Sequence, residues 1–276
     1  MEAIKALSLG KLTLGGKSVA LVAPNGSGKT SNCIAPAILY FLTCFPRGQV
    51  PVTSSSWMQV EKQLFPALRR YMDNPFFDGW TFNKTEIRTP EGGFAVGFST
   101  DNAGRAEGWH PKISPDVDPV FYVLDEAKTI PDSIFTAVSR CTLFHAFITS
   151  SPGADSGTFY DCFHKNSSLY YKIRVKYEDC PHIEINDPGK AERLKKEYGE
   201  QSSFYRSAIL GEFTDLDGQS VIPRRALMDL VNNPPPFLDT GETCGGFDFA
   251  AGGDENVFAA GQGNRFFIAD HWSDPD

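Results

Sequence analysis

The sequence lacks an excess of positive charge and any long apolar segment. Its 26 Lys and Arg residues are outnumbered by 34 Asp and Glu residues, which gives a formal net charge of −8. Such a chain has no global positive field, so any contact with DNA must be local or supplied by neighbouring subunits. No apolar stretch approaches the length of a membrane-spanning helix. These absences argue against a membrane protein and against a generally basic nucleic-acid-binding protein.

Cysteine is also sparse, and repeats and low-complexity tracts are absent. The six cysteines are scattered along the chain and no signal peptide precedes them, so we expect reduced thiols in a cytosolic protein. Two short segments, Cys162–His164 and Cys180–His182, together contain four possible zinc ligands. The spacing within each pair is too short for a common zinc knuckle. We therefore expect buried cysteines and exposed histidines.

A glycine-rich segment near the start of the chain is the first informative motif. The apolar run Val19–Val22 leads directly into Ala23–Thr30, APNGSGKT. A strand that ends in a glycine-rich turn and opens a helix directs several backbone N–H groups at one point, which suits a phosphate. The phosphate-loop pattern has glycine at the position of Ala23, a mild departure. The predicted nucleotide-binding residues are Asn25, Gly26, Ser27, Gly28, Lys29 and Thr30.

An acidic pair follows a second apolar strand. Val120–Leu124 runs straight into Asp125 and Glu126, as expected for a central parallel strand whose carboxyl end faces a ligand. In a nucleotide triphosphatase, Lys29 binds the β- and γ-phosphates, while Thr30 and Asp125 hold Mg²⁺. Glu126 then polarises the attacking water, which makes Glu126 and Lys29 the predicted catalytic residues. The competing interpretation is an ordinary helix start, where acids are favoured by the helix dipole.

Strands and helices alternate along the first two hundred or so residues, which predicts an α/β fold with a mostly parallel central sheet. A buried strand, Phe144–Thr149, ends in Ser150 and Ser151. We expect Thr149, Ser150 and Ser151 at the edge of the sheet where a γ-phosphate would be sensed. The other predicted strands are Gln49–Ser54, a hairpin of Thr81–Arg88 with Phe94–Ser99, and Leu169–Tyr177; the predicted helices are Thr30–Thr43, Trp57–Tyr71, Asp132–Arg140, Lys190–Tyr198 and Ser203–Leu210.

Composition changes near residue 215 and predicts three parts. Residues 1–214 form the P-loop ATPase domain, and residues 215–242 form a linker that contains the run Asn232–Pro236, which cannot pack as helix or sheet. Residues 243–276 start a different pattern of strands, predicted at Gly245–Phe249, Asn256–Gly261 and Arg265–Asp270. The last two form a hairpin through a short glycine-containing turn.

These motifs, in this order, resemble the large terminase subunit of tailed bacteriophages, the motor that packages DNA into proheads. The resemblance covers essentially the whole chain. Besides the phosphate loop and the acidic strand, it rests on Val52–Ser54 with Gln59 and Val60, Phe98–Asn102, Arg105–His110, Thr149–Pro152, Tyr205 to Phe213, and Gly246–Asp248 with Gly253 and Asp254.

The resemblance implies more than the residues alone. Thr149–Ser151 correspond to the motif that couples hydrolysis to movement, and Asp248 to the first metal-binding carboxylate of an RNase H-like nuclease domain. The implied ligands are ATP and Mg²⁺. The implied partners are double-stranded DNA, the small terminase subunit, the portal and prohead, and further copies of the chain in a ring. The implied location is the cytoplasm of a bacterial host, with no membrane.

Three departures from the family qualify these expectations. Only residues 1–22 precede Ala23, fewer than is usual. Many members have an arginine finger within the phosphate loop, where this chain has Asn25. Arg105 and Arg140 are candidate substitutes, in trans within a ring, and an ordinary solvated surface arginine is the alternative interpretation of each. A two-metal nuclease needs several converging carboxylates, and Asp254 and Asp270 are poor replacements for those that would follow residue 276. The nuclease domain is therefore expected to be incomplete and inactive.

Other interpretations remain at this stage. An ABC-type ATPase has a similar phosphate loop, but its Leu-Ser-Gly-Gly signature is missing. A helicase or another P-loop DNA translocase has the same core, although no arginine-bearing helicase motif is evident after Gly153. A catalytically impaired prophage remnant that only binds nucleotide is the non-enzymatic alternative.

Overall fold

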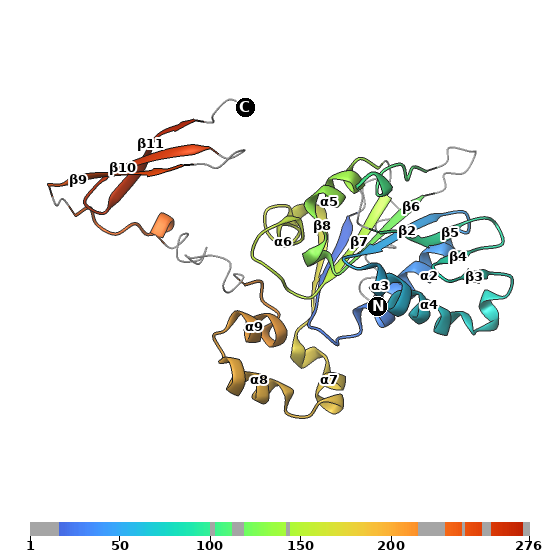
Figure 1. Cartoon of the computed structure of the whole chain (residues 1–276). Helices are drawn as coiled ribbons and strands as arrows, with labels where there is room; N and C mark the ends of the chain where they lie inside the picture. Colours follow the sequence, from blue (N-terminus) through green and yellow to red (C-terminus); the bar gives the residue numbers. More distant parts are fainter. Residues whose placement is uncertain are drawn as a thin grey trace. The chain divides into compact units, whose positions relative to one another are not determined.

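The computed structural model describes residues 17–99, 103–111, 119–141, 144–214, 230–238, 241–249 and 255–272. The chain divides into two compact units, residues 1–219 and residues 220–276, each with its own sheet (Figure 1). The division falls within residues 215–242, the predicted linker, most of which lies outside the described residues. Asp254 and the stretch from Thr100 to Asn102 also lie outside them.

The described part of the first unit contains an eight-stranded sheet in the order β3-β4-β5-β2-β6-β7-β1-β8. From β5 to β8 every neighbouring pair is parallel, whereas β3, β4 and β5 pair antiparallel at one edge. The predicted mostly parallel α/β fold is therefore confirmed. The strands are β1 Ser18–Val22, β2 Gln49–Ser54, β3 Thr81–Asn83, β4 Glu86–Arg88, β5 Phe94–Gly97, β6 Val120–Asp125, β7 Phe144–Ser150 and β8 Tyr170–Arg174.

Helices of this unit connect the strands and cover the sheet (Figure 1). The α-helices are α2 Ala35–Cys44, α3 Trp57–Gln59, α4 Phe65–Met72, α5 Asp132–Ser139, α6 Thr158–Asp161, α7 Pro181–Asn186, α8 Lys190–Tyr198 and α9 Ser203–Tyr205. Wider π-helical turns occur at η1 Lys29–Ile34, η2 Val60–Leu64 and η8 Arg206–Leu210, and short 3₁₀ turns at η3 Pro75–Phe77, η4 Ala103–Arg105, η5 Ala127–Thr129, η6 Ser167–Leu169 and η7 Tyr177–Asp179. Because π-helical turns are frequent at functional sites, the position of η1 directly after the glycine-rich turn is consistent with a binding site there.

Two apolar clusters sandwich the central strands. Alternate residues of a strand point to opposite faces of the sheet, so Val123 packs with α2 and α4 while Tyr122 and Leu124 pack with α5. Burial of these side chains on both faces explains why the central strands are almost continuously apolar. The result is a rigid sheet whose parallel carboxyl ends meet at one edge.

The element boundaries differ from the sequence prediction at three places. The stretch Thr81–Arg88 is not one strand but two, β3 and β4, which pair antiparallel across Asn83 and Glu86. The predicted strand Leu169–Tyr177 is shortened to β8, with a 3₁₀ turn on each side. Helix α7 was not predicted, because its six residues begin at Pro181 and show no clear amphipathic period.

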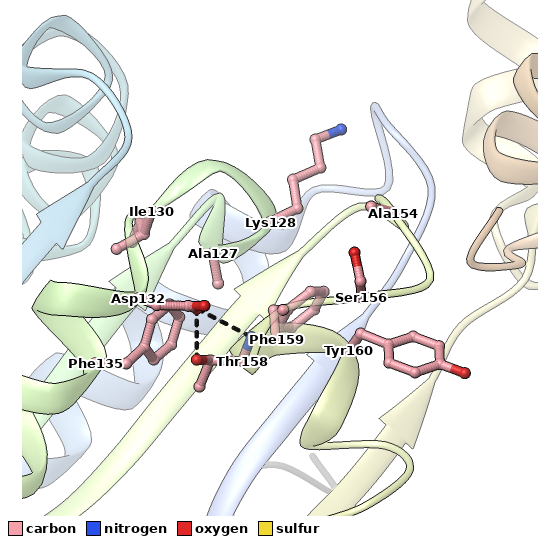
Figure 2. A pocket seen from close by; sticks show the side chains of 11 residues that line it. Ala127, Lys128, Ile130, Asp132, Phe135, Ala154, Ser156, Thr158, Phe159 and Tyr160 are labelled. Carbon is pink, nitrogen blue, oxygen red and sulfur yellow. Dashed lines mark hydrogen bonds between the residues drawn. The ribbon is translucent and has the colours of Figure 1, made fainter. Parts of the chain in front are cut away.

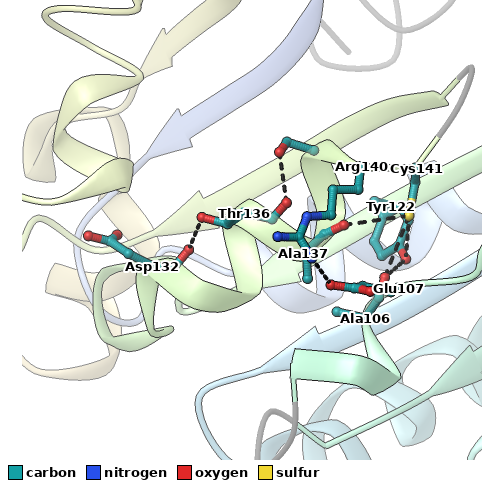
Figure 3. A network of polar contacts seen from close by, with 9 residues as sticks. Ala106, Glu107, Tyr122, Asp132, Thr136, Ala137, Arg140 and Cys141 are labelled. Carbon is teal, nitrogen blue, oxygen red and sulfur yellow. Dashed lines mark hydrogen bonds and ion pairs between the residues drawn. The ribbon is translucent and has the colours of Figure 1, made fainter.

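The segment 103–111 is attached to the sheet by a buried hydroxyl. Figure 3 shows Tyr122 of β6 beside Ala106 and Cys141; its hydroxyl donates to the Ala106 carbonyl oxygen and lies 3.4 Å from the Cys141 Sγ. The Tyr122 side chain is fully buried, and burial raises the pKa of its hydroxyl far above the usual range. Tyr122 is therefore neutral and serves as a structural donor.

Replacing Tyr122 by Phe is expected to lower the free energy of unfolding by about 1–3 kcal/mol, since the buried Ala106 carbonyl loses its hydroxyl donor and keeps only the weak thiol donor of Cys141 at 3.6 Å. Urea denaturation followed by circular dichroism measures this value. Tyr171→Phe on β8, where the side chain is exposed, is the matched control and should change stability by less than about 0.5 kcal/mol. Equal stability of the two variants would contradict a structural role for the Tyr122 hydroxyl.

The second unit contains a three-stranded antiparallel sheet among its described residues, in the order β11-β10-β9. Its strands are β9 Thr243–Asp248, β10 Asn256–Gln262 and β11 Arg265–Trp272. The predicted hairpin between β10 and β11 is confirmed, with Gly263 at a positive φ of 61° in the turn. Within the described part of the chain, no helix combines the length and apolarity needed to cross a membrane.

Candidate functional site

The predicted phosphate loop lies at the carboxyl edge of the sheet, at the end of β1. Gly26 and Gly28 both have positive φ angles, 82° and 80°. A Cβ at Gly28 would lie 2.5 Å from the side-chain nitrogen of Asn32, and the positive φ would itself strain any other residue, so this turn favours glycine. The loop opens into η1, which directs the first backbone N–H groups of that helix toward the edge of the sheet.

A cavity of about 450 Å³ opens beside this loop. Its residues come from three places: the phosphate loop and the start of η1, the acidic residue after β6, and one face of the helical stretch from η2 to α4. They are Asn25, Gly26, Gly28, Lys29, Thr30 and Ser31, then Glu126, and finally Lys62, Gln63, Pro66, Ala67 and Arg70. The predicted nucleotide-binding residues thus border one cavity, except Ser27, whose hydroxyl oxygen is buried with no hydrogen-bond partner in the described structure.

Two residues predicted to hold a metal ion are in direct contact. The Thr30 hydroxyl donates to Asp125 Oδ2 at 3.0 Å, although the residues are 95 positions apart in the sequence. The other oxygen of Asp125 accepts from the Thr149 hydroxyl at 2.8 Å and from the Glu126 backbone N–H at 2.9 Å. The carboxylate is therefore held in one orientation by groups from η1, β6 and β7.

Lys29 is a buried cation at the floor of this cavity. Its side chain is 6% exposed, and Nζ donates to the carbonyl oxygens of Ala23 and Pro24 at 3.3 and 3.2 Å. Burial lowers the pKa of the Lys29 amine, while the carboxylates of Glu126 and Asp125 oppose that shift. A buried cation without a directly bonded carboxylate is well suited to an incoming anion.

Glu126 has an unusual backbone. Its φ and ψ angles are 52° and 43°, which makes it the only non-glycine residue with positive φ in the described part of the chain. This left-handed conformation turns the chain sharply between β6 and the following 3₁₀ turn, so the side chain borders the cavity. The Ser150 hydroxyl donates to its Oε2 at 3.3 Å.

The residues after β6 are connected to the end of β7 by further hydrogen bonds. The backbone N–H of Lys128 donates to the Ser150 hydroxyl at 3.3 Å, and Lys128 Nζ donates to the Ser151 hydroxyl at 2.7 Å. Thr149, Ser150 and Ser151 are buried. Each of these three predicted sensing residues therefore hydrogen-bonds directly to a residue of the segment Asp125–Lys128, called here the acidic segment after its first two residues.

The donors at Thr30 and Asp125 fit a magnesium ion. A hydroxyl and a carboxylate oxygen are hard oxygen ligands of the kind that Mg²⁺ prefers, and Mg²⁺ usually takes only one or two protein groups beside water and substrate phosphates. The hydrogen bonds that Asp125 accepts do not fully offset the cost of burying its negative charge. Burial raises the pKa of Asp125 despite the opposing hydrogen bonds from Thr149 and Thr30. A cation at this position would offset the burial of its charge.

Asp125→Asn is expected to raise the melting temperature of the protein without nucleotide by a few degrees, while abolishing magnesium-dependent turnover. A pKa raised in the folded state means that ionisation disfavours folding, so the advantage of the neutral Asn should grow as pH rises. Thermal melts of both proteins at several pH values, without Mg²⁺, measure the difference. A lower melting temperature of the variant at neutral pH would contradict this account of Asp125.

Three predicted residues are not brought to this cavity. Arg105 is exposed, and Arg140 lies at the end of α5, where Nη1 pairs with Glu107 Oε1 at 2.6 Å (Figure 3). Because α5 leads back to the start of β7, Arg140 lies at the edge of the sheet opposite the phosphate loop. Asp248 belongs to the second unit and is exposed on β9.

Two described carboxylates of the second unit, Asp248 and Asp270, do not converge. Asp248 of β9 lies opposite Val257 of β10, whereas Asp270 of β11 lies opposite Phe258, the next residue of β10. Side chains of successive residues in a strand point to opposite faces of the sheet, so the two carboxylates lie on different faces. Among the described residues, no group of three or more His, Cys, Asp or Glu side chains is arranged to hold a metal ion. Elsewhere in the chain, Cys162 and Cys180 are buried and His164 and His182 exposed, as predicted.

A second, smaller cavity lies beside the acidic segment but is not a nucleotide site. Figure 2 shows it between Ala127–Asp132 and Ala154–Tyr160. Its volume is about 40 Å³, and no residue of the phosphate loop lines it. Thr158 donates to Asp132 through its backbone N–H at 3.1 Å, which fixes the start of α6 to the start of α5.

The sequence prediction missed three basic residues near the phosphate loop. Lys62 and Arg70 line the large cavity from the helical wall. His182 of α7 contacts the loop itself, with Nε2 3.0 Å from the Gly26 carbonyl oxygen. Lys62 and Arg70 have the i, i+8 spacing of one helix face, but a charged face of this kind usually indicates exposure to solvent rather than a site.

Comparison with known proteins gives matches at the level of structure. No family model matches the chain, and no curated protein matches it significantly. The large terminase of a thermophilic bacteriophage matches with a TM-score of 0.54 and 12% identity, over 94% of this chain and 64% of that chain. The same terminase in complex with ADP gives a TM-score of 0.54 at 13% identity, over 94% of this chain and 63% of that one.

A shorter structure matches the first unit. The ATPase domain of the large terminase of the Thermus phage P74-26 has a TM-score of 0.53 and 16% identity, over 72% of this chain and 91% of that chain. At these identities the likeness is one of fold, and the chain spans about 64% of the length of the first, longer terminase. The predicted resemblance is confirmed at that level: the chain has the fold of phage large terminases, with a P-loop sheet of the type found in their ATPase domains.

Proposed function

We propose that the first unit is a magnesium-dependent ATPase and the motor part of a phage large terminase, which moves double-stranded DNA into a prohead. One observation carries the proposal: Lys29, the Thr30–Asp125 pair and Glu126 meet at the carboxyl edge of one sheet. Solved structures of this fold add support, since the large terminase of the thermophilic bacteriophage has been determined with ADP and with ATP-gamma-S.

Each of these side chains has a distinct task in the proposed reaction. Lys29 and the loop N–H groups bind the phosphates and offset charge that develops on the γ-phosphoryl group. Thr30 and Asp125 would hold Mg²⁺, which neutralises phosphate charge when bound. The Glu126 carboxylate orients the attacking water and accepts its proton. Because the protein positions groups that are already charged, little rearrangement is needed at the moment of reaction.

The contacts between β6 and β7 support a coupling role for Thr149–Ser151. Ser150 hydrogen-bonds to Glu126, and Thr149 to Asp125, so a displacement of either acid would be passed to the end of β7, which leads to Pro152. Ser207 of η8 in turn donates to the Pro152 carbonyl oxygen at 3.0 Å. This chain of contacts offers a route from the site to the last helices of the unit.

The partners follow from the proposed motor role. They are double-stranded DNA, a small terminase subunit, the portal of a prohead and further copies of the chain in a ring, in the cytoplasm of a bacterial host. A ring also gives Arg140 a task in trans as an arginine finger, since it lies away from the site of its own chain. In this proposal the strands β9–β11, with Asp248, correspond to the first strands of an RNase H-like nuclease domain.

The test is steady-state phosphate release by the purified chain with Mg²⁺ and ATP, with and without double-stranded DNA. Turnover that requires Mg²⁺ supports the ATPase, and stimulation by DNA supports the motor. Turnover stimulated only by single strands would favour a helicase-like translocase instead. Tight nucleotide binding without turnover, in the presence or absence of DNA, would favour a remnant that only binds nucleotide.

A further inference from the structure

The wall of the large cavity opposite the phosphate loop carries positive charge. Lys62, Pro66 and Arg70 follow one another at four-residue intervals along η2 and α4, and all three line the cavity. Residues at this spacing lie on the same face of a helix. The cavity is therefore bordered by three cations, Lys29, Lys62 and Arg70, against one carboxylate, Glu126, a balance that favours a polyanion over a neutral ligand.

Arg70 is the more available of the two cations on this wall. Lys62 Nζ lies 3.3 Å from Glu61 Oε1, so part of its charge is already compensated. No carboxylate among the described residues is within ion-pair distance of the Arg70 guanidinium. Asn25, the loop residue that faces the cavity beside Gly26, is uncharged. An anion in the cavity would accordingly find its second unpaired cation, after Lys29, at Arg70.

The backbone position of Arg70 is fixed relative to the phosphate loop. The hydroxyl of the next residue, Tyr71, donates to the Ser31 carbonyl oxygen at 3.0 Å, and Ser31 itself lines the cavity. This bond joins the last turn of α4 to the first turn after the loop. The other neighbour, Arg69, has its guanidinium carbon 4.2 Å from the centre of the Phe82 ring and does not line the cavity.

We propose that Arg70 is a phosphate-binding residue of the nucleotide site, which donates to the phosphate chain from the helical wall opposite Lys29. The inference rests on the proposed function, since it takes the cavity to be a nucleotide site. A guanidinium suits this task because its planar fork of N–H groups matches phosphate oxygens.

The test compares Arg70→Gln with Arg69→Gln, which removes the same charge from the adjacent position. Binding of Mg²⁺-ATP and of Mg²⁺-tripolyphosphate to each full-length variant is measured by titration calorimetry. Arg70→Gln should weaken both ligands by about 10- to 100-fold, the loss typical of a charge-assisted hydrogen bond. Arg70→Lys should recover part of that loss, and Arg69→Gln should stay within about twofold of the parent. Thermal melts check that both glutamine variants are folded.

Three results would overturn the proposal in distinguishable ways. Equal affinities of Arg70→Gln and Arg69→Gln, with the parent binding normally, would remove Arg70 from the site and leave the proposed function intact. A loss with Mg²⁺-ATP but not with Mg²⁺-tripolyphosphate would show that Arg70 contacts the nucleoside instead of the phosphates. Failure of the parent chain to bind either ligand would overturn the nucleotide site, and this inference with it.

Discussion

Glu126→Gln is expected to bind Mg²⁺-ATP as tightly as the parent chain and to hydrolyse it about 10²–10⁴ times more slowly. The amide has the size of the carboxylate and can still accept from Ser150, which donates to Oε2 at 3.3 Å. It cannot accept a proton from the attacking water. Turnover is measured as phosphate release, and binding as the fluorescence of a labelled nucleotide.

Glu86→Gln is the matched control for this substitution. Glu86 is also a partly exposed glutamate, but it pairs with Arg88 of the same strand, β4, and does not line the cavity. Its loss should leave kcat within about twofold of the parent, because exposed ion pairs contribute little. Unchanged turnover in Glu126→Gln would remove the proposed base from the mechanism, and equal losses in both variants would indicate a general effect on folding.

Lys29→Ala is expected to weaken the binding of Mg²⁺-ATP by about 100-fold or more, because a buried, charge-assisted contact to the phosphates is lost. Within the described structure the Lys29 amine donates to the loop carbonyls of Ala23 and Pro24 and forms no ion pair at short distance. The fold should therefore persist when the amine is removed. Titration calorimetry measures the affinity, and a thermal melt verifies the fold.

Lys195→Ala serves as the control, since this lysine of α8 is 42% exposed and pairs with Glu200, and neither residue lines the cavity. Its nucleotide affinity should equal that of the parent. A Lys29→Ala chain that binds ATP normally would show that the glycine-rich turn is not a phosphate cradle. A chain that fails to fold would instead assign Lys29 a structural role through its two carbonyl contacts.

Much of the fold was predictable because the central strands are buried on both faces. β1, β6 and β7 consist mainly of apolar residues, so each stands out in the sequence. The order of these strands was not predictable. β7 lies between β1 and β6, which places Thr149–Ser151 between the phosphate loop and the acidic pair. Local patterns indicate which residues are buried and how apolar residues repeat along the chain, but they do not indicate which strands become neighbours in the sheet.

The candidate site was predictable only where a local motif carried it. The phosphate loop and the Asp125–Glu126 pair have specific spacing, and the structure brings them together: Glu126 lines the cavity beside the loop, and Asp125 accepts from Thr30. Arg70 and His182 have no such motif, since an exposed arginine on a helix and a histidine after Pro181 look like ordinary surface residues. Their relation to the loop depends on tertiary packing, such as the contact of Tyr71 with Ser31.

The left-handed backbone of Glu126 also sets stability against the position of its carboxylate. A non-glycine residue in this conformation costs about 1 kcal/mol relative to glycine, and the residue that bears this cost is the proposed base. Stability alone would favour glycine or asparagine at this position. Backbone strain of this kind is typical of functional sites, where geometry is kept at the expense of stability. Glu126→Gly is therefore expected to gain stability and to lose the carboxylate that the proposed hydrolysis needs.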